Sequence, residues 1–435
     1  MKFTIHQKTL SRALECGAVA SLSEEAQSDT SNLALLMKAI KITVDATNLT
    51  VESATNLMAV KYTIPVNTDN KIEVKEPGTI MVPAKEFVQW VDKQGSSVIC
   101  VVLSQLDNPE FITVGDDKES SKHAIKKIGT VKFVSKDESK TGNKWALDCY
   151  DPSQSVIVDF KKPEVLFEAP ASQVIEAIKY TAFASMPKHY EHVYDSMLFE
   201  TFDKNLYIAA CDTARCSVYK MDKVEKVNQN LVDGKIRVLI PCTFINTISK
   251  LIDVKSKMIF YYDEVKNRVF VSQTESQIGL EFRIATADKD LSKKFPPISM
   301  LLKKSYVPLC NVQKQLLHSR LATASMVNKS TAMFTFNKLG NSLTIKTISE
   351  SGLNPSICVA PANDLTGSRK VVWAVQHVTD AIKVVKDETL SILMPKDNDK
   401  GQDNGSFKVV STVDSNFSYY SMSVNNSKYD LNEAD

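Results

Sequence analysis

The feature that most constrains this chain is a pattern that occurs three times along its 435 residues. The copies are spaced by roughly 140 to 160 residues, as expected of a chain built from similar units. Each copy opens with a short alternating strand, followed by a helix whose apolar residues are spaced three and four apart. These strands begin near Phe3, Val165 and Tyr306. A second strand and helix follow in each copy, near Ile80, Val238 and Val371. The sequence therefore predicts six helices of one kind.

Between the two helices of each copy, a polar turn interrupts an apolar stretch, which is typical of an antiparallel hairpin. The three hairpins are predicted to run from Leu35 to Val51, from Met197 to Ile208 and from Met333 to Ile345. The predicted fold class is therefore α+β, with three similar domains that each place two helices on antiparallel sheet.

Charged and polar stretches at Lys161–Pro163 and Lys303–Ser305 are the predicted domain joins. We expect domain I at residues 1–162, domain II at 163–303 and domain III at 304–424. Domain I carries two polar runs, 116–122 and 135–143, that are predicted to be exposed loops. A C-terminal tail, 425–435, is expected to be too polar to join a core.

Composition narrows the class of protein. With 53 basic and 51 acidic residues the formal net charge is +2, so bulk charge alone would not hold the chain on nucleic acid. No apolar run approaches the ~18 residues of a membrane-spanning helix, and Met1–His6 alternates like a strand, so we expect a cytoplasmic protein. The eight cysteines form no CxxC pair, which indicates reduced thiols.

Motifs for catalysis or cofactor binding are missing from the sequence. It contains no phosphate-binding loop, dinucleotide fingerprint, HExxH or GxSxG, so we predict no cofactor and no catalytic residue. One alternative is a metal-dependent hydrolase using His189 and His192, although a metal site needs three or four ligands. Cys211 and Cys216, with Asp212 beside them, could suggest a thiol nucleophile, but packing is favoured because no histidine is near.

Basic residues recur on the polar faces of the predicted helices, at spacings that place them in rows. They are Lys8, Arg12, Lys85, Lys93, Lys250, Lys314 and Lys383. On any one helix such a row is usually solvated surface. Its recurrence on related helices equally fits a common surface that faces phosphates.

Several stretches, in this order on a threefold repeat, resemble the bacterial DNA polymerase III β subunit family, the replicative sliding clamps. They are Met1–Thr4, Glu76–Thr79, Val82–Ala84, Ser196–Thr201, Cys211–Arg215 and Lys294–Pro296. The resemblance implies half of a pseudo-sixfold ring, closed by a head-to-tail homodimer around duplex DNA, with helices inside and sheet outside. It further implies a non-catalytic processivity factor that binds the replicative DNA polymerase and a clamp loader.

The resemblance also implies site residues. A pocket for a partner peptide would comprise Tyr194, Cys211, Thr213, Arg215, Cys216, Pro296, Met300, Leu301, Tyr420, Met422 and Val424. His189 and Tyr190 would join the basic residues in facing DNA, and Met326 and Val327 would lie at the dimer interface. The chain diverges from the family where Cys211–Cys216 replaces Thr-Asp-Gly-His-Arg-Leu and where Met422–Asn425 replaces Met-Pro-Met-Arg, and a cell or a bacterial virus could encode it.

Other interpretations of these residues stay open at this point. Met326 and Val327 could pack into the core of domain III, and Met300 and Leu301 into the cores beside them. The repeat could also belong to a scaffold that does not bind DNA.

Overall fold

The computed structural model describes residues 1–29, 32–95, 97–112, 124–136, 142–156, 159–186, 193–225, 236–275, 278–286, 293–349, 355–396, 405–424 and 429. The chain forms two compact units. Unit 1 comprises Met1–Ser172, Glu225–Asn228 and Lys250–Thr286, and unit 2 comprises Gln173–Val224, Gln229–Ser249 and Ala287–Asp435. None of the helices in the described ranges is long and apolar enough to cross a membrane.

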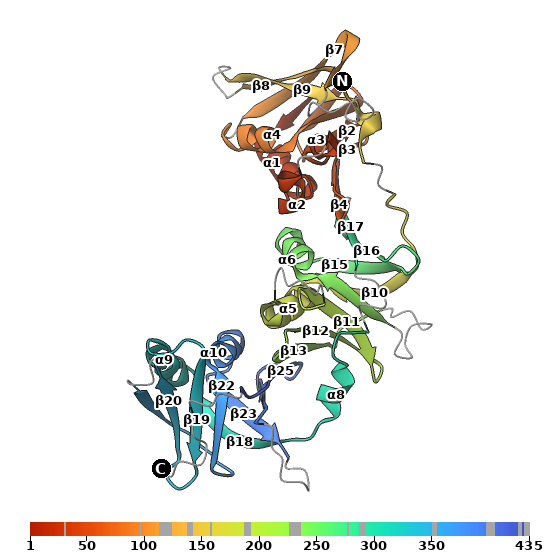
Figure 1. Cartoon of the computed structure of the whole chain (residues 1–435). Coiled ribbons are helices and arrows are strands. Elements are labelled where there is room, and N and C mark those ends of the chain that lie inside the picture. Colours follow the sequence, from red (N-terminus) through yellow and green to blue (C-terminus); the bar gives the residue numbers. More distant parts are fainter. Residues whose placement is uncertain are drawn as a thin grey trace. The chain divides into compact units, whose positions relative to one another are not determined.

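Unit 1 is built on one antiparallel sheet of 13 described strands (Figure 1). In sheet order they are β10 (Val165–Pro170), β15 (Lys257–Asp263), β16 (Arg268–Glu275), β17 (Ile278–Ala285), β4 (Met58–Pro65), β3 (Asn48–Ala54), β2 (Ala39–Val44), β6 (Gly78–Pro83), β9 (Lys144–Tyr150), β8 (Ile125–Lys136), β7 (Val98–Ile112), β1 (Lys2–His6) and β5 (Ile72–Glu76). The helices that lie wholly in this unit are α1 (Gln7–Gly17), α2 (Glu24–Ser28), α3 (Asn32–Met37) and α4 (Ala84–Asp92).

Unit 2 contains two antiparallel sheets among its described residues. The eight-stranded sheet has the order β14 (Arg237–Pro241), β11 (Ser196–Phe202), β12 (Asn205–Cys211), β13 (Arg215–Met221), β25 (Phe417–Ser421), β24 (Phe407–Val410), β23 (Thr389–Pro395) and β18 (Tyr306–Gln313). The four-stranded sheet has the order β21 (Pro355–Pro361), β20 (Ser342–Ile348), β19 (Thr331–Asn337) and β22 (Arg369–Ala374). The helices are α5 (Ala171–Thr181), α6 (Cys242–Leu251), α8 (Ile298–Lys303), α9 (Lys314–Ser325) and α10 (Val375–Val384), of which α5 begins and α6 ends at the unit boundary.

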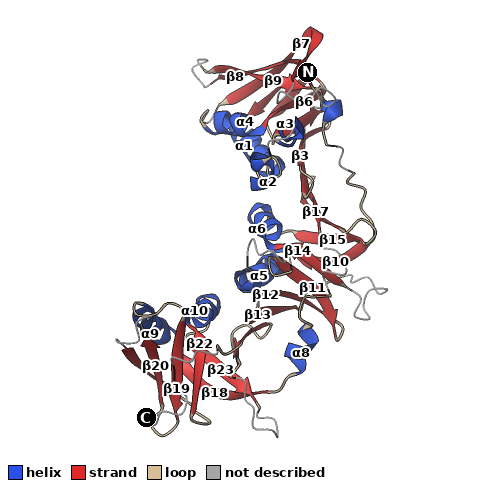
Figure 2. Cartoon of the chain, viewed as in Figure 1, coloured by secondary structure: helices blue, strands red, loops and turns tan. Residues whose placement is uncertain are grey.

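The predicted repeat of strand followed by helix is confirmed in all six places (Figure 2). The pairs are β1 with α1, β6 with α4, β10 with α5, β14 with α6, β18 with α9, and β22 with α10. Each helix buries an apolar stripe; in α1 the stripe includes Leu10, Ala13 and Leu14. The α+β fold class predicted from the sequence is therefore confirmed.

The sheets repeat as well. In unit 1 the order β6-β2-β3-β4 continues through β17 into β16-β15-β10, and in unit 2 the order β14-β11-β12-β13 continues through β25 into β24-β23-β18. Two half-sheets lack such a continuation. The half-sheet β22-β19-β20 ends at β21, and β1-β7-β8 ends at β9, which pairs with β6 only through Met81 and Tyr150.

The first hairpin begins later than the sequence predicted. Leu35 and Met37 lie in α3, so strand β2 starts only at Ala39. The run Asn32–Met37 is rich in leucine, alanine and methionine, which favour helix, and its apolar character alone does not distinguish a buried helix from a strand.

Two expectations about polar segments are also corrected. Ser135, predicted to lie in an exposed loop, belongs to β8 and is buried, with its hydroxyl donating to Gln94 Oε1 at 2.8 Å. Tyr429, predicted to stay outside any core, packs against Met333 and Val372. Its hydroxyl donates to the Thr331 carbonyl at 2.9 Å, so Tyr429 joins the core of unit 2. The predicted division into three domains stays a prediction.

The side chain of Asp387 joins two segments of unit 2 by hydrogen bonds to residues 411–413. Its buried carboxylate lies between α10 and β23, and it accepts hydrogen bonds from the Ser411 and Thr412 hydroxyls and from the backbone N–H groups of Thr412 at 2.7 Å and Val413 at 3.0 Å. Burial opposes the charge, but the hydrogen bonds outweigh burial, so the pKa of Asp387 lies below its ordinary value of 3.8.

We expect Asp387→Asn to lower the free energy of unfolding by about 2 kcal/mol at neutral pH, the scale of a lost charged hydrogen bond. Because the folded pKa is lowered, this stabilisation is complete above pH 3.8 and is lost as the pH falls through the lower, folded value. Denaturant unfolding of both proteins across pH measures the difference. Glu388→Gln, which changes an exposed neighbour, is the control. If the difference in unfolding free energy between wild type and Asp387→Asn grew below pH 3.8, the carboxylate of Asp387 would not be the stabilising group.

Candidate functional site

A cavity of about 610 Å³, including its open mouth, lies in unit 2. It brings together eight of the residues predicted for the partner-peptide pocket, namely Cys211, Thr213, Arg215, Cys216, Pro296, Leu301, Tyr420 and Met422. They come from the β12–β13 turn, from the segment through α8, and from the end of β25. Segments that lie far apart in sequence thus form one wall.

The other three predicted pocket residues lie elsewhere. Tyr194 packs against the apolar cluster next to the cavity, and Met300 on α8 is 69% exposed. Val424 packs with Met333, Val372 and Tyr429, and its N–H donates to the Val372 carbonyl at 2.8 Å.

Six residues that line the cavity were not predicted from the sequence. They are Asp212, Ala214, Lys304, Tyr306, Ser406 and Ser421. Lys304 was interpreted as part of a domain join, and Tyr306 as the start of a strand. The position of Tyr306 was the available signal, since an aromatic residue that opens a predicted strand needs a surface to pack on.

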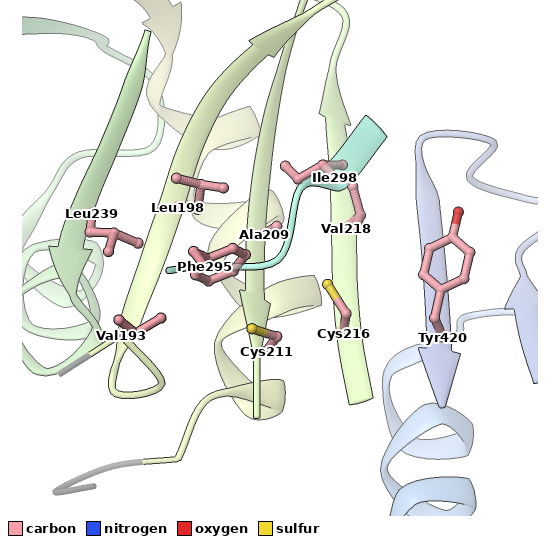
Figure 3. Packing of buried hydrophobic residues seen from close by; sticks show 10 residues of the cluster. All are labelled: Val193, Leu198, Ala209, Cys211, Cys216, Val218, Leu239, Phe295, Ile298 and Tyr420. Atoms are coloured by element: carbon pink, nitrogen blue, oxygen red, sulfur yellow. The ribbon is translucent and has the colours of Figure 1, made fainter. Parts of the chain in front are cut away.

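A buried apolar cluster adjoins the cavity and shares Cys211, Cys216 and Tyr420 with its lining (Figure 3). Its members are Val193, Leu198, Ala209, Cys211, Cys216, Val218, Leu239, Phe295, Ile298 and Tyr420. Cys211, Cys216 and Tyr420 are directly opposite one another on β12, β13 and β25, so their side chains lie on one face of the sheet.

A tight turn shapes one rim of the cavity. The Asp212 N–H donates to the Arg215 carbonyl at 3.0 Å, and Asp212 Oδ1 accepts from the backbone N–H groups of Ala214 and Arg215, both at 2.8 Å. Asp favours such turns because its short side chain bonds to the backbone just ahead. The turn is therefore built by local chemistry and does not depend on a glycine.

A buried ion-pair network holds Arg215. Its Nε lies 2.8 Å from Asp212 Oδ2 and its guanidinium 2.6 Å from Asp380 Oδ2 on α10, and all three side chains are at most 16% exposed. His377, also on α10, shares a hydrogen bond with Ser421 at 3.0 Å. Burial and the charge of Arg215 lower the pKa of His377, so the imidazole is neutral at physiological pH.

The two thiols in the cavity wall are poor nucleophiles. Burial raises the pKa of Cys211 to about 12 and places that of Cys216 well above its ordinary value. Because the thiolate is the reactive form, this favours packing over the thiol-nucleophile alternative.

The predicted basic residues lie on or beside the repeat helices. Lys8 and Arg12 on α1 are exposed, as are Lys85 on α4, Lys93 at its C-cap, Lys250 on α6 and Lys383 on α10. Lys314 on α9 is half-buried, and its Nζ donates to the Val385 carbonyl at 2.6 Å. Arg12 is held by Glu15 and by the Leu251 carbonyl.

Helices α1 and α4 pack beside each other in unit 1, as do α9 and α10 in unit 2, so basic residues from two helices can share one surface in each unit. His189 and Tyr190 lie outside the described residues. The same holds for His192, and the described part of the chain contains no group of three or more His, Cys, Asp or Glu side chains arranged to hold a metal. The described part of the chain therefore gives no support to the hydrolase alternative.

Met326, predicted for the dimer interface, is 83% exposed at the C-cap of α9, and Val327 is half-buried. This exposure argues against packing of Met326 into the core. The helix packs on β21, whose outer face exposes Ile357 and Val359.

No known protein-family model matches the sequence, and no curated protein matches it either. The fold does match solved structures. The DNA polymerase III subunit β of Pseudomonas aeruginosa matches with a TM-score of 0.73 and 14% identity, over 98% of this chain and 100% of that one. The sliding clamp of Bacillus subtilis (TM-score 0.75, 14% identity) and the β chain of Streptococcus pneumoniae (0.76, 14%) match over 98% of this chain and 99% and 100% of theirs. From end to end, the chain has the fold of the DNA polymerase III β sliding clamps.

Proposed function

We propose that this chain is a DNA sliding clamp that encircles duplex DNA and tethers a replicative DNA polymerase during synthesis, without catalysing a reaction itself. The observation that carries the proposal is that the clamp fold extends over the whole chain, including both half-sheets. A topological tether needs weak attraction to phosphates and no base contacts, and the near-neutral net charge suits such a role. A bacterial or phage protein of this function works on DNA in the cytoplasm.

In this proposal the three domains are residues 1–162, 163–303 and 304–424, and the ring is a homodimer. The sheet repeat supports a specific junction. Strand β21 is equivalent to β4 and β13, and β9 is equivalent to β17 and β25. Pairing of β21 with the partner's β9 would therefore complete a third eight-stranded sheet, with Met326 and Val327 beside it. Such a contact joins two different surfaces and closes after two copies.

The cavity of unit 2 is the proposed site for short peptides of the polymerase and of a clamp loader. It is apolar, partly open and lined by soft sulfur and aromatic side chains, which can adapt to different peptides. One of the similar structures is the Pseudomonas aeruginosa clamp bound to griselimycin, matched with a TM-score of 0.74 and 15% identity over 98% of this chain and 100% of that one. A loader is needed because the sequence carries no nucleotide-binding motif.

A threading assay tests the ring without any partner protein. Linear duplex is fixed to beads by one end, the protein is added, and the free end is then capped with a bulky protein before a salt wash. We expect retention only when the cap is added after the protein, and release when a restriction enzyme cuts the capped end away. If the protein were retained equally well whether the end was capped before or after its addition, a topological tether would be contradicted.

A variant in which five basic residues are neutralised together should thread more slowly; they are Lys8, Arg12, Lys85, Lys93 and Lys250. Its DNA binding should also depend less on salt. The slope of the logarithm of the binding constant against the logarithm of salt concentration should become shallower by roughly 0.9 for each phosphate that the variant no longer neutralises. Once the end is capped, the variant should be retained as well as the wild type, because the tether is mechanical. Loss of the capped variant in the wash would show that charge, and not topology, holds the protein on DNA.

A further inference from the structure

Lys304 lines the cavity and Lys408 does not, but both lie against aromatic rings of the cavity wall. Lys304 Nζ lies 5.6 Å from the ring centre of Tyr306, and Lys408 Nζ lies 5.6 Å from Tyr306 and 5.3 Å from Tyr420. Lys304 Nζ also donates to Ser406 Oγ at 3.3 Å. Among the described residues no carboxylate lies within 4.0 Å of either ammonium group. Burial lowers the pKa of both lysines, with no acid to offset it.

The sheet register ties these lysines to the apolar wall. Cys211 is opposite Cys216, Cys216 is opposite Tyr420, and Tyr420 is opposite Lys408. Residues directly opposite one another point to the same face, so four neighbouring strands present one row that changes from apolar to aromatic to cationic. Figure 3 shows the first three members of this row on adjacent strands.

The other charged groups of the cavity are already satisfied. Arg215 is paired with two carboxylates, Asp212 and Asp380, so that network carries no spare positive charge. His377 is neutral at physiological pH because its pKa is lowered. Within the described part of the chain, the unpaired positive charge at this cavity is therefore concentrated at Lys304 and Lys408.

We infer that the cavity selects peptides that carry a carboxylate beside their apolar anchors, and that Lys304 and Lys408 are the residues that determine this specificity. The inference rests on the proposed role of the cavity as the partner-peptide site. An apolar anchor would fill the part lined by Cys211, Cys216 and Met422, while an aspartate or glutamate would reach the ammonium groups. A charge-assisted hydrogen bond beside apolar walls is stronger than the same contact in water.

The partner sequence is unknown, so the test starts from random peptides displayed on phage and selected on the full-length protein. Selection is run in parallel on wild type, on Lys304→Gln/Lys408→Gln and on Lys303→Gln. Lys303 is a matched control, because its Nζ lies over Phe202 at 5.5 Å and it does not line the cavity. Met422→Asp serves to discard peptides that bind elsewhere. We expect aspartate and glutamate next to apolar residues in peptides selected on wild type and Lys303→Gln, but not in those selected on the double variant.

Selected peptides are then synthesised with a fluorescent label, together with versions in which each acid is replaced by its amide. By anisotropy, the acidic peptide should bind wild type about ten- to a hundredfold more tightly than its amide version, the scale of a hydrogen bond to a charged group. On the double variant this ratio should fall to about one, while thermal unfolding stays that of wild type.

Two negative outcomes are distinguishable. In the first, the selected peptides lose binding on Met422→Asp but show no preference for acidic residues, either on wild type or on the double variant. This outcome would overturn the inference but would still support the proposed peptide site. If no selected peptide loses binding on Met422→Asp, the proposed peptide site itself is wrong, and the inference falls with it.

Discussion

Replacing Arg215 with alanine is expected to lower the free energy of unfolding of unit 2 by about 3 to 5 kcal/mol, the scale of a buried ion pair that loses one partner. The guanidinium is 11% exposed and contacts Asp212 and Asp380, which are 13% and 16% exposed. Its removal would leave two buried carboxylates without a counter-charge. The expected loss of stability therefore comes more from the two buried carboxylates left without a counter-charge than from the lost attraction between Arg215 and these carboxylates.

Unfolding of unit 2 can be followed by one fluorophore. The chain has three tryptophans, and in a Trp90→Phe/Trp145→Phe background only Trp373 remains. Trp373 is fully buried, and its indole N–H donates to the Gly405 carbonyl at 2.7 Å, so its emission should shift when unit 2 opens. Urea titrations of this background with and without Arg215→Ala give the difference directly.

A matched control lies just beyond the same helix. Lys386, two residues after α10, pairs with Glu176 on α5, and their side chains are 51% and 35% exposed. Exposed pairs contribute about 0 to 1 kcal/mol, so Lys386→Ala should change little. Adding Asp212→Asn and Asp380→Asn to Arg215→Ala should recover part of the stability. An Arg215→Ala protein as stable as Lys386→Ala would show that the buried carboxylates find other partners.

The sequence predicted those parts of the fold that depend on local periodicity. All six strand and helix pairs were predicted because a helix that covers a sheet needs apolar residues three and four apart, as in Leu10, Ala13 and Leu14 of α1. The run that ends at Met37 was assigned to the wrong element, because a short apolar run has the same composition in a buried helix and in a buried strand. Tyr429 was missed for a related reason, since one buried aromatic ring leaves no periodic signal in a polar tail.

The candidate site was only partly predictable. Resemblance to the clamps led to the wall from Cys211 to Cys216 and to Tyr420 and Met422, which the structure brings to one cavity. It could not lead to Lys304 and Lys408, because their placement depends on the pairing of β24 with β25 and on the aromatic pair Tyr306 and Tyr420. Long-range strand register of this kind is not encoded in any short motif.

Met326→Asp is expected to convert the proposed ring dimer into monomers. Burying an unpaired carboxylate costs at least about 3 kcal/mol, and a closed dimer has two equivalent junctions, so the dissociation constant should rise on the order of ten-thousandfold. Sedimentation velocity measures the change, and far-UV circular dichroism checks that the monomer is folded. Lys329→Asp, three residues along the chain from Met326, is a control for added negative charge. A Met326→Asp dimer as tight as wild type would place the junction elsewhere.

The sheet repeat makes a second substitution informative. Leu147 is half-buried on β9, the strand proposed to meet β21 of the partner, so Leu147→Asp should also give monomers. When the two variants are mixed, one junction can form between the intact β9 surface of the Met326→Asp chain and the intact β21 surface of the Leu147→Asp chain. The other junction carries both substitutions and stays open. The mixture should therefore dimerise more tightly than either variant alone, yet fail to be retained on end-capped DNA. An interface that used the same patch on both copies would gain nothing from mixing, because every mixed pair would still carry a Met326→Asp patch in its interface.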